Sequence, residues 1–171
     1  MQETAQQYIN RLTGYLDGKD PVKAQAATAK RLSRLIQGVS RPRLTRRPAP
    51  GKWSVAEILA HLADDEIVGG FRMRLIVGAP GTPIQGFDQD RWAETGNYAK
   101  RDPKDSLELF RTLREANIVF YKSLTPAQRK LFGIHSERGK ESVEQIFKLL
   151  AGHDINHMKQ IEAILGKRRL G

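Results

Sequence analysis

The stretch Ala151-Gly152-His153-Asp154-Ile155-Asn156-His157 decides how the fold of this chain is interpreted. Its two histidines are four residues apart, so on a helix they lie on one face, about 6 Å from each other. That spacing allows two imidazoles to converge on one metal ion. The apolar residues on either side continue the same stripe at steps of three or four: Ile146, Leu150, Ile161 and Ile164. We therefore expect both histidines to point into the protein.

A third histidine, His61, repeats the pattern on another predicted helix, between Ile58 and Val68. Of the four histidines in the chain, three thus lie on inward stripes. Three neutral imidazoles can hold a divalent ion at about 2.0–2.1 Å and leave a position open for water or substrate. His61, His153 and His157 are therefore the predicted metal ligands. A histidine on an apolar stripe can also be a hydrogen-bonded core residue, and spacing alone leaves that alternative open.

Length and composition favour one globular domain over residues 1–171, with 39% hydrophobic and 28% charged residues. The chain has no cysteine, which excludes disulfides, iron–sulfur clusters and thiolate zinc sites. An all-nitrogen site accepts zinc or nickel, and also cobalt, iron or copper. No apolar run is long enough for a membrane span or a signal peptide, so we expect a cytoplasmic protein.

The net charge of +10 comes almost entirely from one segment. Residues 19–52 hold ten Lys or Arg and one acidic residue, a net of +9. Its proline-rich part, residues 38–52, is predicted to be a basic loop in which the prolines exclude a regular helix. It contains no aromatic platform for single strands and no helix-turn-helix or zinc-finger pattern. A solvated loop is therefore the preferred interpretation, and nucleic-acid binding the less favoured one.

Four long amphipathic helices are predicted, and no strand is evident. They begin at strong signals: Asp20-Pro21, the Ser54/Glu57 capping box, Asp102-Pro103 and the Ser142/Gln145 capping box. Residues 1–18 add a short helix, and the basic residues 167–169 suit the C-terminus of the last helix. The expected fold is all-α, an antiparallel four-helix bundle with a metal site between its helices.

Two connections are long enough to cover a pocket beside that site. Residues 79–102 show no helical or strand period and carry Asp88, Asp90 and Trp92. Residues 132–141 carry His135, Glu137 and Arg138, with His135 either a proton shuttle or an ordinary loop histidine. Asp65 lies one turn after His61 and could orient a ligand or approach the metal. Asp154 and Asn156 are expected off the ligand face, as polar residues near the site or on the surface.

Two motifs resemble a known family. Gly51-Lys52-Trp53-Ser54 through Glu57 to His61 is similar to the Gly-Lys-Trp-Ser-x-x-Glu-x-x-x-His signature of the DinB-like (DinB/YfiT) superfamily. His153-Asp154-Ile155-Asn156-His157 with Gln160-Ile161 is similar to its closing His-x-x-x-His-x-x-Gln-Ile motif. The resemblance spans roughly residues 20–165 and implies a four-helix bundle with a divalent metal on the three histidines. In the family it resembles, some members use a low-molecular-weight thiol that the metal activates.

Several functions follow from this pattern. The favoured one is a metal-dependent enzyme, a thiol S-transferase or a hydrolase acting on a small-molecule substrate, with no catalytic residue assigned. A non-catalytic metal-binding or small-molecule-binding stress protein is the alternative, ahead of a basic nucleic-acid-associated module. Asp154 occupies the position of the glutamate in His-Glu-x-x-His, which argues against a peptidase. A homodimer is open, and a membrane partner is not expected.

Overall fold

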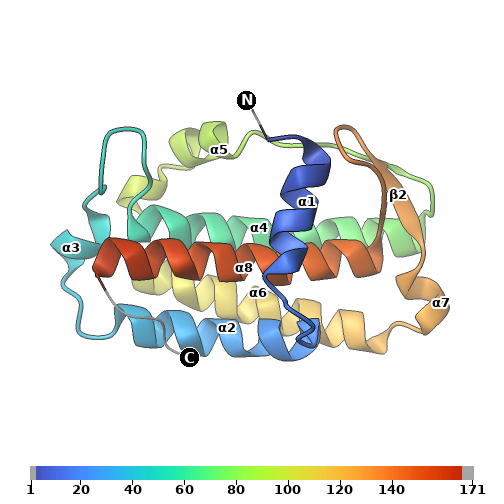
Figure 1. The fold of residues 1–171 in the computed structure, drawn as a ribbon, viewed down its shortest axis with the longest axis horizontal. Helices are drawn as coiled ribbons and strands as arrows, with labels where there is room; N and C mark the ends of the chain where they lie inside the picture. The colour runs from blue at the N-terminus through green and yellow to red at the C-terminus, as the bar shows by residue number, and fades with distance from the viewer. Residues whose placement is uncertain (1–2, 167–171) are drawn as a thin grey trace.

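The computed structural model describes residues 3–166, and four long helices lying side by side form its body (Figure 1). They are α2 (Pro21–Ile36), α4 (Val55–Gly78), α6 (Pro103–Ser123) and α8 (Val143–Leu165). The predicted all-α four-helix bundle is confirmed. The predicted role of residues 167–169 lies outside the described residues. Within residues 3–166, no helix combines the length and apolar character of a membrane span.

The long helices start where the sequence predicted. The Ser54 hydroxyl accepts from the Glu57 backbone N–H, and the Glu57 carboxylate accepts in return from the Ser54 N–H at 2.8 Å. Ser142 and Gln145 form the same reciprocal pair at the start of α8. Because a capping box satisfies free N–H groups of the first turn, each helix begins at a defined residue. The positions of the histidines farther along these helices follow from that.

Neighbouring helices run in both relative directions, so the expected antiparallel arrangement does not hold for every pair. On α4, Glu66 contacts Arg114 of α6, and Arg74, two turns farther on, contacts Asn117, so these two helices are parallel. Figure 1 shows α8 running opposite to α4 and α6, with α2 on the side of α8 away from α4. A parallel pair cannot be joined by a tight turn. Residues 79–102 therefore return along the whole bundle before α6 begins, which accounts for the length of this connection.

Two apolar clusters fill the bundle on either side of a polar middle. One cluster contains Leu32, Leu59, Phe110 and Ile161, and the other contains Met73, Ile76, Tyr121 and Phe147. Each fully buried side chain of this size contributes about 1.5–3 kcal/mol to folding. The polar residues in between are therefore held in place by packing at both ends.

The expectation that the chain has no strand is wrong. A small sheet contains β1 (Pro83–Ile84), β2 (Phe132–His135) and β3 (Gly139–Ser142) in that order. Strands β1 and β2 are parallel, and β2 and β3 form an antiparallel hairpin whose turn uses Gly139 at φ 73°. Segments of two to four residues are too short to show an alternating pattern, so no strand signal is visible for them.

Two segments predicted to be irregular contain short helices. The connection at residues 79–102 holds α5 (Gln89–Thr95), capped by Asp88, and the 3₁₀ turn η1 (Tyr98–Lys100). The basic loop at residues 38–52 holds α3 (Arg41–Thr45), with Pro42 in its first turn, where a missing N–H is tolerated. A further short helix, α7 (Pro126–Arg129), begins at a capping box formed by Thr125 and Gln128.

The first helix, α1 (Ala5–Gly14), lies across α8 rather than joining the bundle (Figure 1). The crossing is possible because Gly152 has no side chain. A Cβ there would stand 2.1 Å from the carbonyl oxygen of Leu12. The close approach brings α1 directly over the segment of α8 that carries His153.

Replacing Gly152 by alanine is therefore expected to push α1 away from α8. Overpacking of this kind costs about 1–3 kcal/mol, which urea unfolding would measure, and limited proteolysis would show earlier cleavage within α1. Gly14→Ala is the matched control, because a Cβ at Gly14 meets nothing within 4 Å. Equal stability of the two variants would show that α1 does not depend on this contact.

Candidate metal centre

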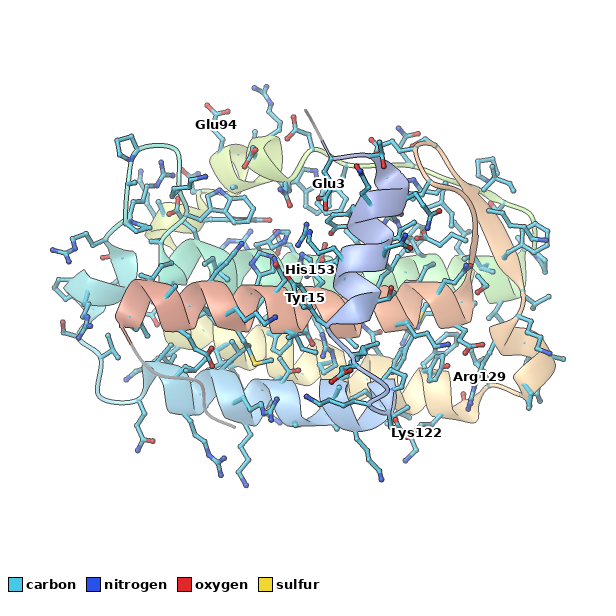
Figure 2. The ribbon with its side chains drawn as sticks, viewed as in Figure 1. Glu3, Tyr15, Glu94, Lys122, Arg129 and His153 are labelled. Carbon is cyan, nitrogen blue, oxygen red and sulfur yellow. The ribbon has the colours of Figure 1, made fainter. Side chains whose placement is uncertain are left out.

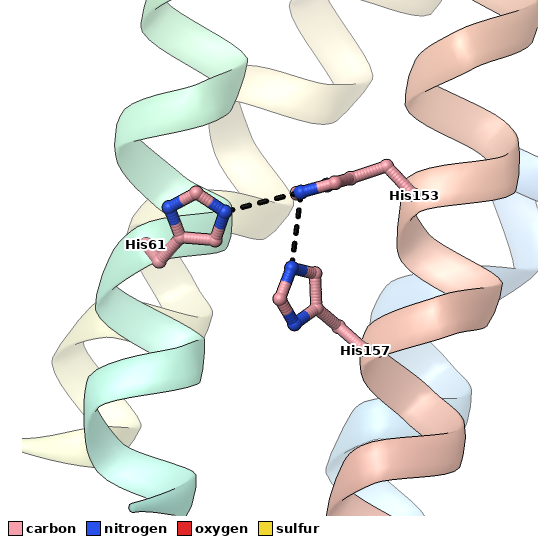
Figure 3. A group of neighbouring side chains, drawn as sticks. All are labelled: His61, His153 and His157. Carbon is pink, nitrogen blue, oxygen red and sulfur yellow. Dashed lines mark hydrogen bonds between the residues drawn. The ribbon is translucent and has the colours of Figure 1, made fainter. Parts of the chain in front are cut away.

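His61, His153 and His157, here called the histidine triad, meet between α4 and α8 (Figure 3). The Nε2 atom of His153 lies 3.1 Å from His61 Nε2 and 3.0 Å from His157 Nε2. The three side chains offer one nitrogen each within 4.8 Å of one another, and all three residues are buried. His61 comes from the second turn of α4 and the other two from α8, so two different helices supply the candidate ligand nitrogens.

Neighbouring side chains hold two of the rings in position. The Nδ1 of His157 lies 2.8 Å from Gln160 Oε1, so Nδ1 is the protonated nitrogen and donates to the amide oxygen. The Nδ1 of His153 lies 3.2 Å from Asp65 Oδ2, close enough for an ion pair but without hydrogen-bond alignment. A partner on Nδ1 leaves the lone pair of Nε2 facing the other rings, as a metal ligand requires. Asp65 therefore lies beside His153, a candidate ligand, as expected if Asp65 orients that ring.

All three imidazoles are neutral at neutral pH. Burial lowers the pKa of His61 to about 4, against a smaller opposing effect of Asp65. Burial, together with the Arg114 cation, lowers the pKa of His153 to about 4. Burial and the other two rings lower the pKa of His157 well below its ordinary value. Only the neutral imidazole binds a metal, so burial prepares this site for one.

The metal-free protein should consequently lose stability as the pH falls. The folded pKa of about 4 for His61 and His153 is below the unfolded value near 6.5. The unfolded chain therefore takes up protons first, and stability present at pH 7 declines toward pH 4. Each of these two histidines should remove about 2 kcal/mol between pH 7 and pH 5. Asp65 acts in the opposite direction, because burial raises its pKa.

Urea unfolding of chelator-treated protein at pH 7, 6 and 5 would measure this decline. A His61→Leu variant should show a shallower dependence, because one of the groups that titrate is gone. If the free energy of unfolding depended on pH equally in both proteins, His61 would not be one of the groups whose lowered pKa causes the decline.

A cavity of about 540 Å³, here called the triad cavity, lies between α1, α4, α8 and the β2–β3 hairpin. His61 and His153 line it, as does Tyr8 of α1. Figure 2 shows Glu3, another lining residue, above the start of α1 and His153 beside the middle of that helix. The helix that crosses at Gly152 thus forms one wall of the cavity. Five predicted pocket residues also line it: Asp65, Asp88, His135, Glu137 and Arg138.

A second cavity of about 510 Å³ approaches the triad from the other side. His157 and Gln160 line it together with Trp53 and Asp90, which was also predicted for a pocket. Trp92, the remaining predicted pocket residue, lines neither of these two cavities and packs against Phe87 at a ring distance of 4.7 Å. The residues 79–102 therefore border the site on both sides, through Asp88 and Asp90.

A buried charge cluster lies next to the triad and was not foreseen. Arg114 donates to Asp154 Oδ1 at 3.0 Å and to Glu66 Oε1 at 2.7 Å, and Thr28 donates to Asp154 Oδ2. Burial alone would lower the pKa of Arg114, but the two carboxylates outweigh it and raise that pKa above its ordinary value. The surface interpretation of Asp154 is thus wrong. It faces the bundle interior, beside His153 in sequence.

Part of the basic segment is tied to the protein. Arg47 forms an ion pair with the buried carboxylate of Glu57, and Arg43 donates to the carbonyl of Leu165 at 2.7 Å. These contacts fasten the connection between α2 and α4 to the start of α4 and to the end of α8.

Residues 24–161 match the model of the DinB superfamily. The chain belongs to the DinB superfamily. The resemblance carried by the two motifs is thereby confirmed, and the matched range contains all three histidines of the triad. Helix α1 precedes it.

Related proteins agree with this DinB assignment. A protein of Halalkalibacterium halodurans named "Putative metal-dependent hydrolase" is 24% identical over 144 residues, covering 84% of each chain. One of the same name from Bacillus licheniformis is 30% identical over 122 residues, covering 71% of this chain and 68% of its own. The solved structure of YfiT from Bacillus subtilis, titled "a probable metal-dependent hydrolase with an unusual four-helix bundle topology", has a TM-score of 0.77 at 22% identity. It covers 86% of this chain and 87% of its own.

Proposed function

We propose that this protein is a divalent-metal-dependent hydrolase whose metal is held by His61, His153 and His157. The observation that carries the proposal is the convergence of three buried, neutral Nε2 atoms beside a cavity. Without a metal, His153 Nε2 carries at most one proton, and it can donate that proton to His61 Nε2 or to His157 Nε2 but not to both. A shared cation would satisfy all three lone pairs at once.

The donor set fits such an ion. Two nitrogens held about 2.0–2.1 Å from a tetrahedral ion are about 3.3 Å apart, close to the 3.0 and 3.1 Å found here. Zinc and nickel suit three imidazoles without a thiolate. With only three protein ligands, one position remains for water or substrate, as in catalytic rather than structural sites.

A divalent ion in this position would act as a Lewis acid and lower the pKa of a bound water. The protein's own groups then have defined tasks. Asp65 and Gln160 orient two of the rings, and Asp65 lines the triad cavity, where its carboxyl can hold or release a proton. Helix α1 restricts the access of bulk water to the same cavity. A small-molecule substrate would enter beside His61 and His153.

The second cavity supports one other reaction, transfer to a low-molecular-weight thiol. Hydrolysis needs only water as its second reactant. Transfer to a thiol also needs a space near the metal in which the thiol can bind. The cavity beside His157 and Gln160 offers that room. Consumption of an electrophile that depends strictly on an added thiol would favour transfer, and turnover without thiol would favour hydrolysis.

The test of the proposed function compares metal-free, zinc-loaded and nickel-loaded protein on a panel of small esters and amides. We expect hydrolysis only with metal, lost on chelation and restored on reloading. Metal binding without turnover of any ester, amide or thiol-dependent substrate would identify a binding protein instead of an enzyme.

A further inference from the structure

The end of the triad cavity remote from the histidines carries Arg72, an arginine of α4. Along α4, His61, Asp65 and Arg72 all line the cavity, at steps of four and seven that place them on one face. At 1.5 Å per residue, Arg72 lies about 16 Å along the helix from His61. The cavity is therefore elongated, with the triad at one end and Arg72 at the other.

Arg72 lies 5.8 Å from the centre of the Phe87 ring and has no carboxylate bonded to it among residues 3–166. Its Nη2 donates to the carbonyl of Gln85 at 2.6 Å, and among residues 3–166 it forms no ion pair. Burial, with Arg138 nearby, lowers the pKa of Arg72 below its ordinary value. A partly buried guanidinium normally has a carboxylate or phosphate partner.

Three acidic residues of the cavity are occupied by other groups. Glu141 receives two hydrogen bonds from Arg138, at 2.9 and 3.0 Å, and Glu3 pairs with Arg11. Asp88 accepts from two backbone N–H groups at the start of α5. Glu137 forms no ion pair among residues 3–166, and its charge opposes the lowering of the pKa of Arg72 and of His135. Arg138 is thus paired directly with a carboxylate, whereas Arg72 has carboxylates nearby but none bonded to it.

His135 supplies a second donor without a partner. Its Nδ1 accepts from the backbone N–H groups of Glu137 at 3.1 Å and Arg138 at 3.4 Å. Because Nδ1 accepts, the proton of the neutral ring is on Nε2. Burial lowers the pKa of His135, which keeps the ring neutral, and its Nε2 is buried with no hydrogen-bond partner within residues 3–166. His135 is thus a buried member of β2 rather than a loop histidine.

The two donors are anchored next to each other by the small sheet. His135 is paired with Ile84 across the parallel β1–β2 ladder, and the Ser136 N–H donates to the Ile84 carbonyl at 2.9 Å. The carbonyl that holds Arg72 belongs to Gln85, the next residue. Neighbouring strands are about 4.8 Å apart, so Arg72 and His135 lie at the same end of the cavity.

Between this donor pair and the triad, the cavity wall is apolar. Val68 of α4 and Ile146, Leu149 and Leu150 of α8 line it. The cavity therefore combines the triad nitrogens at one end, a hydrophobic middle and, at the other end, the Arg72 guanidinium and the Nε2–H of His135, with the carboxylate of Glu137 also in the wall.

We propose that Arg72 and the Nε2–H of His135 bind a carboxylate of the substrate, at the end of the triad cavity opposite the histidines. The substrate class is then an ester or amide whose reacting bond is separated from a carboxylate by a short aliphatic segment. The nature of the reacting bond rests on the proposed function. The binding of a carboxylate by Arg72 and His135 does not depend on the metal.

The subsite is tested with hexanoate, hexanamide and hexyl phosphate as probes, titrated into metal-free full-length protein and followed by NMR. Metal-free protein is used because hexanoate would otherwise bind the ion directly. We expect hexanoate to bind at least 10-fold more tightly than hexanamide and to shift the Nε2–H signal of His135. Equal affinity for the acid and the amide, or tighter binding of hexyl phosphate, overturns the carboxylate assignment.

Two variants test the residues. Arg72→Met removes the charge, and His135→Asn keeps an acceptor near the Nδ1 position for the turn while removing the Nε2 donor. Each should weaken hexanoate binding at least 10-fold and leave hexanamide binding unchanged. Arg34→Met, an exposed arginine on α2, is the control and should change neither. Unchanged hexanoate affinity in both Arg72→Met and His135→Asn overturns the proposal, and failure of the metal-loaded protein to hydrolyse any ester overturns only the proposed function.

Discussion

Replacing His61, His153 or His157 by alanine is expected to abolish stoichiometric binding of one divalent ion per chain. Loss of a residue that merely orients a ligand weakens a metal site about 10–100-fold, so loss of a ligand should cost at least about 100-fold. The three Nε2 atoms lie within 4.8 Å of one another, and no cysteine is present to replace one of them. Equilibrium dialysis with zinc and nickel, followed by metal analysis, would measure the affinities.

The fourth histidine provides a matched control. His135→Asn removes an equally buried imidazole that lies outside the triad, so this variant should keep full metal stoichiometry. Thermodynamic linkage gives an independent readout. At a metal concentration 100 times the Kd, the wild type should gain about 2.7 kcal/mol in free energy of unfolding, and the three alanine variants should gain almost nothing. Normal binding in any one of those variants would remove that histidine from the site.

Replacing Arg114 by methionine should destabilise the fold by about 3–5 kcal/mol, because it leaves the carboxylates of Asp154 and Glu66 buried without a cation. Arg114 is 2% exposed, so water cannot compensate for its loss. Urea unfolding at pH 7 would measure the change. The expected effect is larger than that of any single apolar contact in the two clusters.

Arg111→Met is the control on the same helix, since its pairs with Glu108 and Glu115 are on the surface and contribute little. A triple variant that adds Asp154→Asn and Glu66→Gln to Arg114→Met should recover part of the loss, because the uncompensated charges are then gone. An Arg114→Met protein as stable as the Arg111→Met protein would show that the buried cluster does not hold the bundle together.

The buried charge cluster also helps to orient the histidine triad. Asp154 follows His153 on α8 and points to the opposite side, toward Arg114 of α6. Its contacts with Arg114 and Thr28 fix the rotation of α8 about its axis. The face that carries His153 and His157 is thereby directed toward α4.

The sequence alone determined the four long helices and the choice of the three histidines. Helix starts are local, because a capping box such as Ser54/Glu57 involves residues three positions apart. The period of apolar residues identified the inward faces, and the spacing of His153 and His157 placed both on one of them. Two motifs resembling the DinB family indicated the same site, and residues 24–161 match the model of that family.

Only the tertiary structure decided what surrounds those histidines. The partners of Arg114 are 40 and 48 residues away in the chain, and a lone arginine on a helix gives no sign of being buried. The pairing of β1 with β2 brings Gln85 next to His135 across about 50 residues, and strands this short show no period. The parallel arrangement of α4 and α6, and the crossing of α1 at Gly152, likewise depend on contacts between distant segments. Local preferences therefore specify each long helix, whereas the shape and charge of the cavity arise only when distant side chains are packed together.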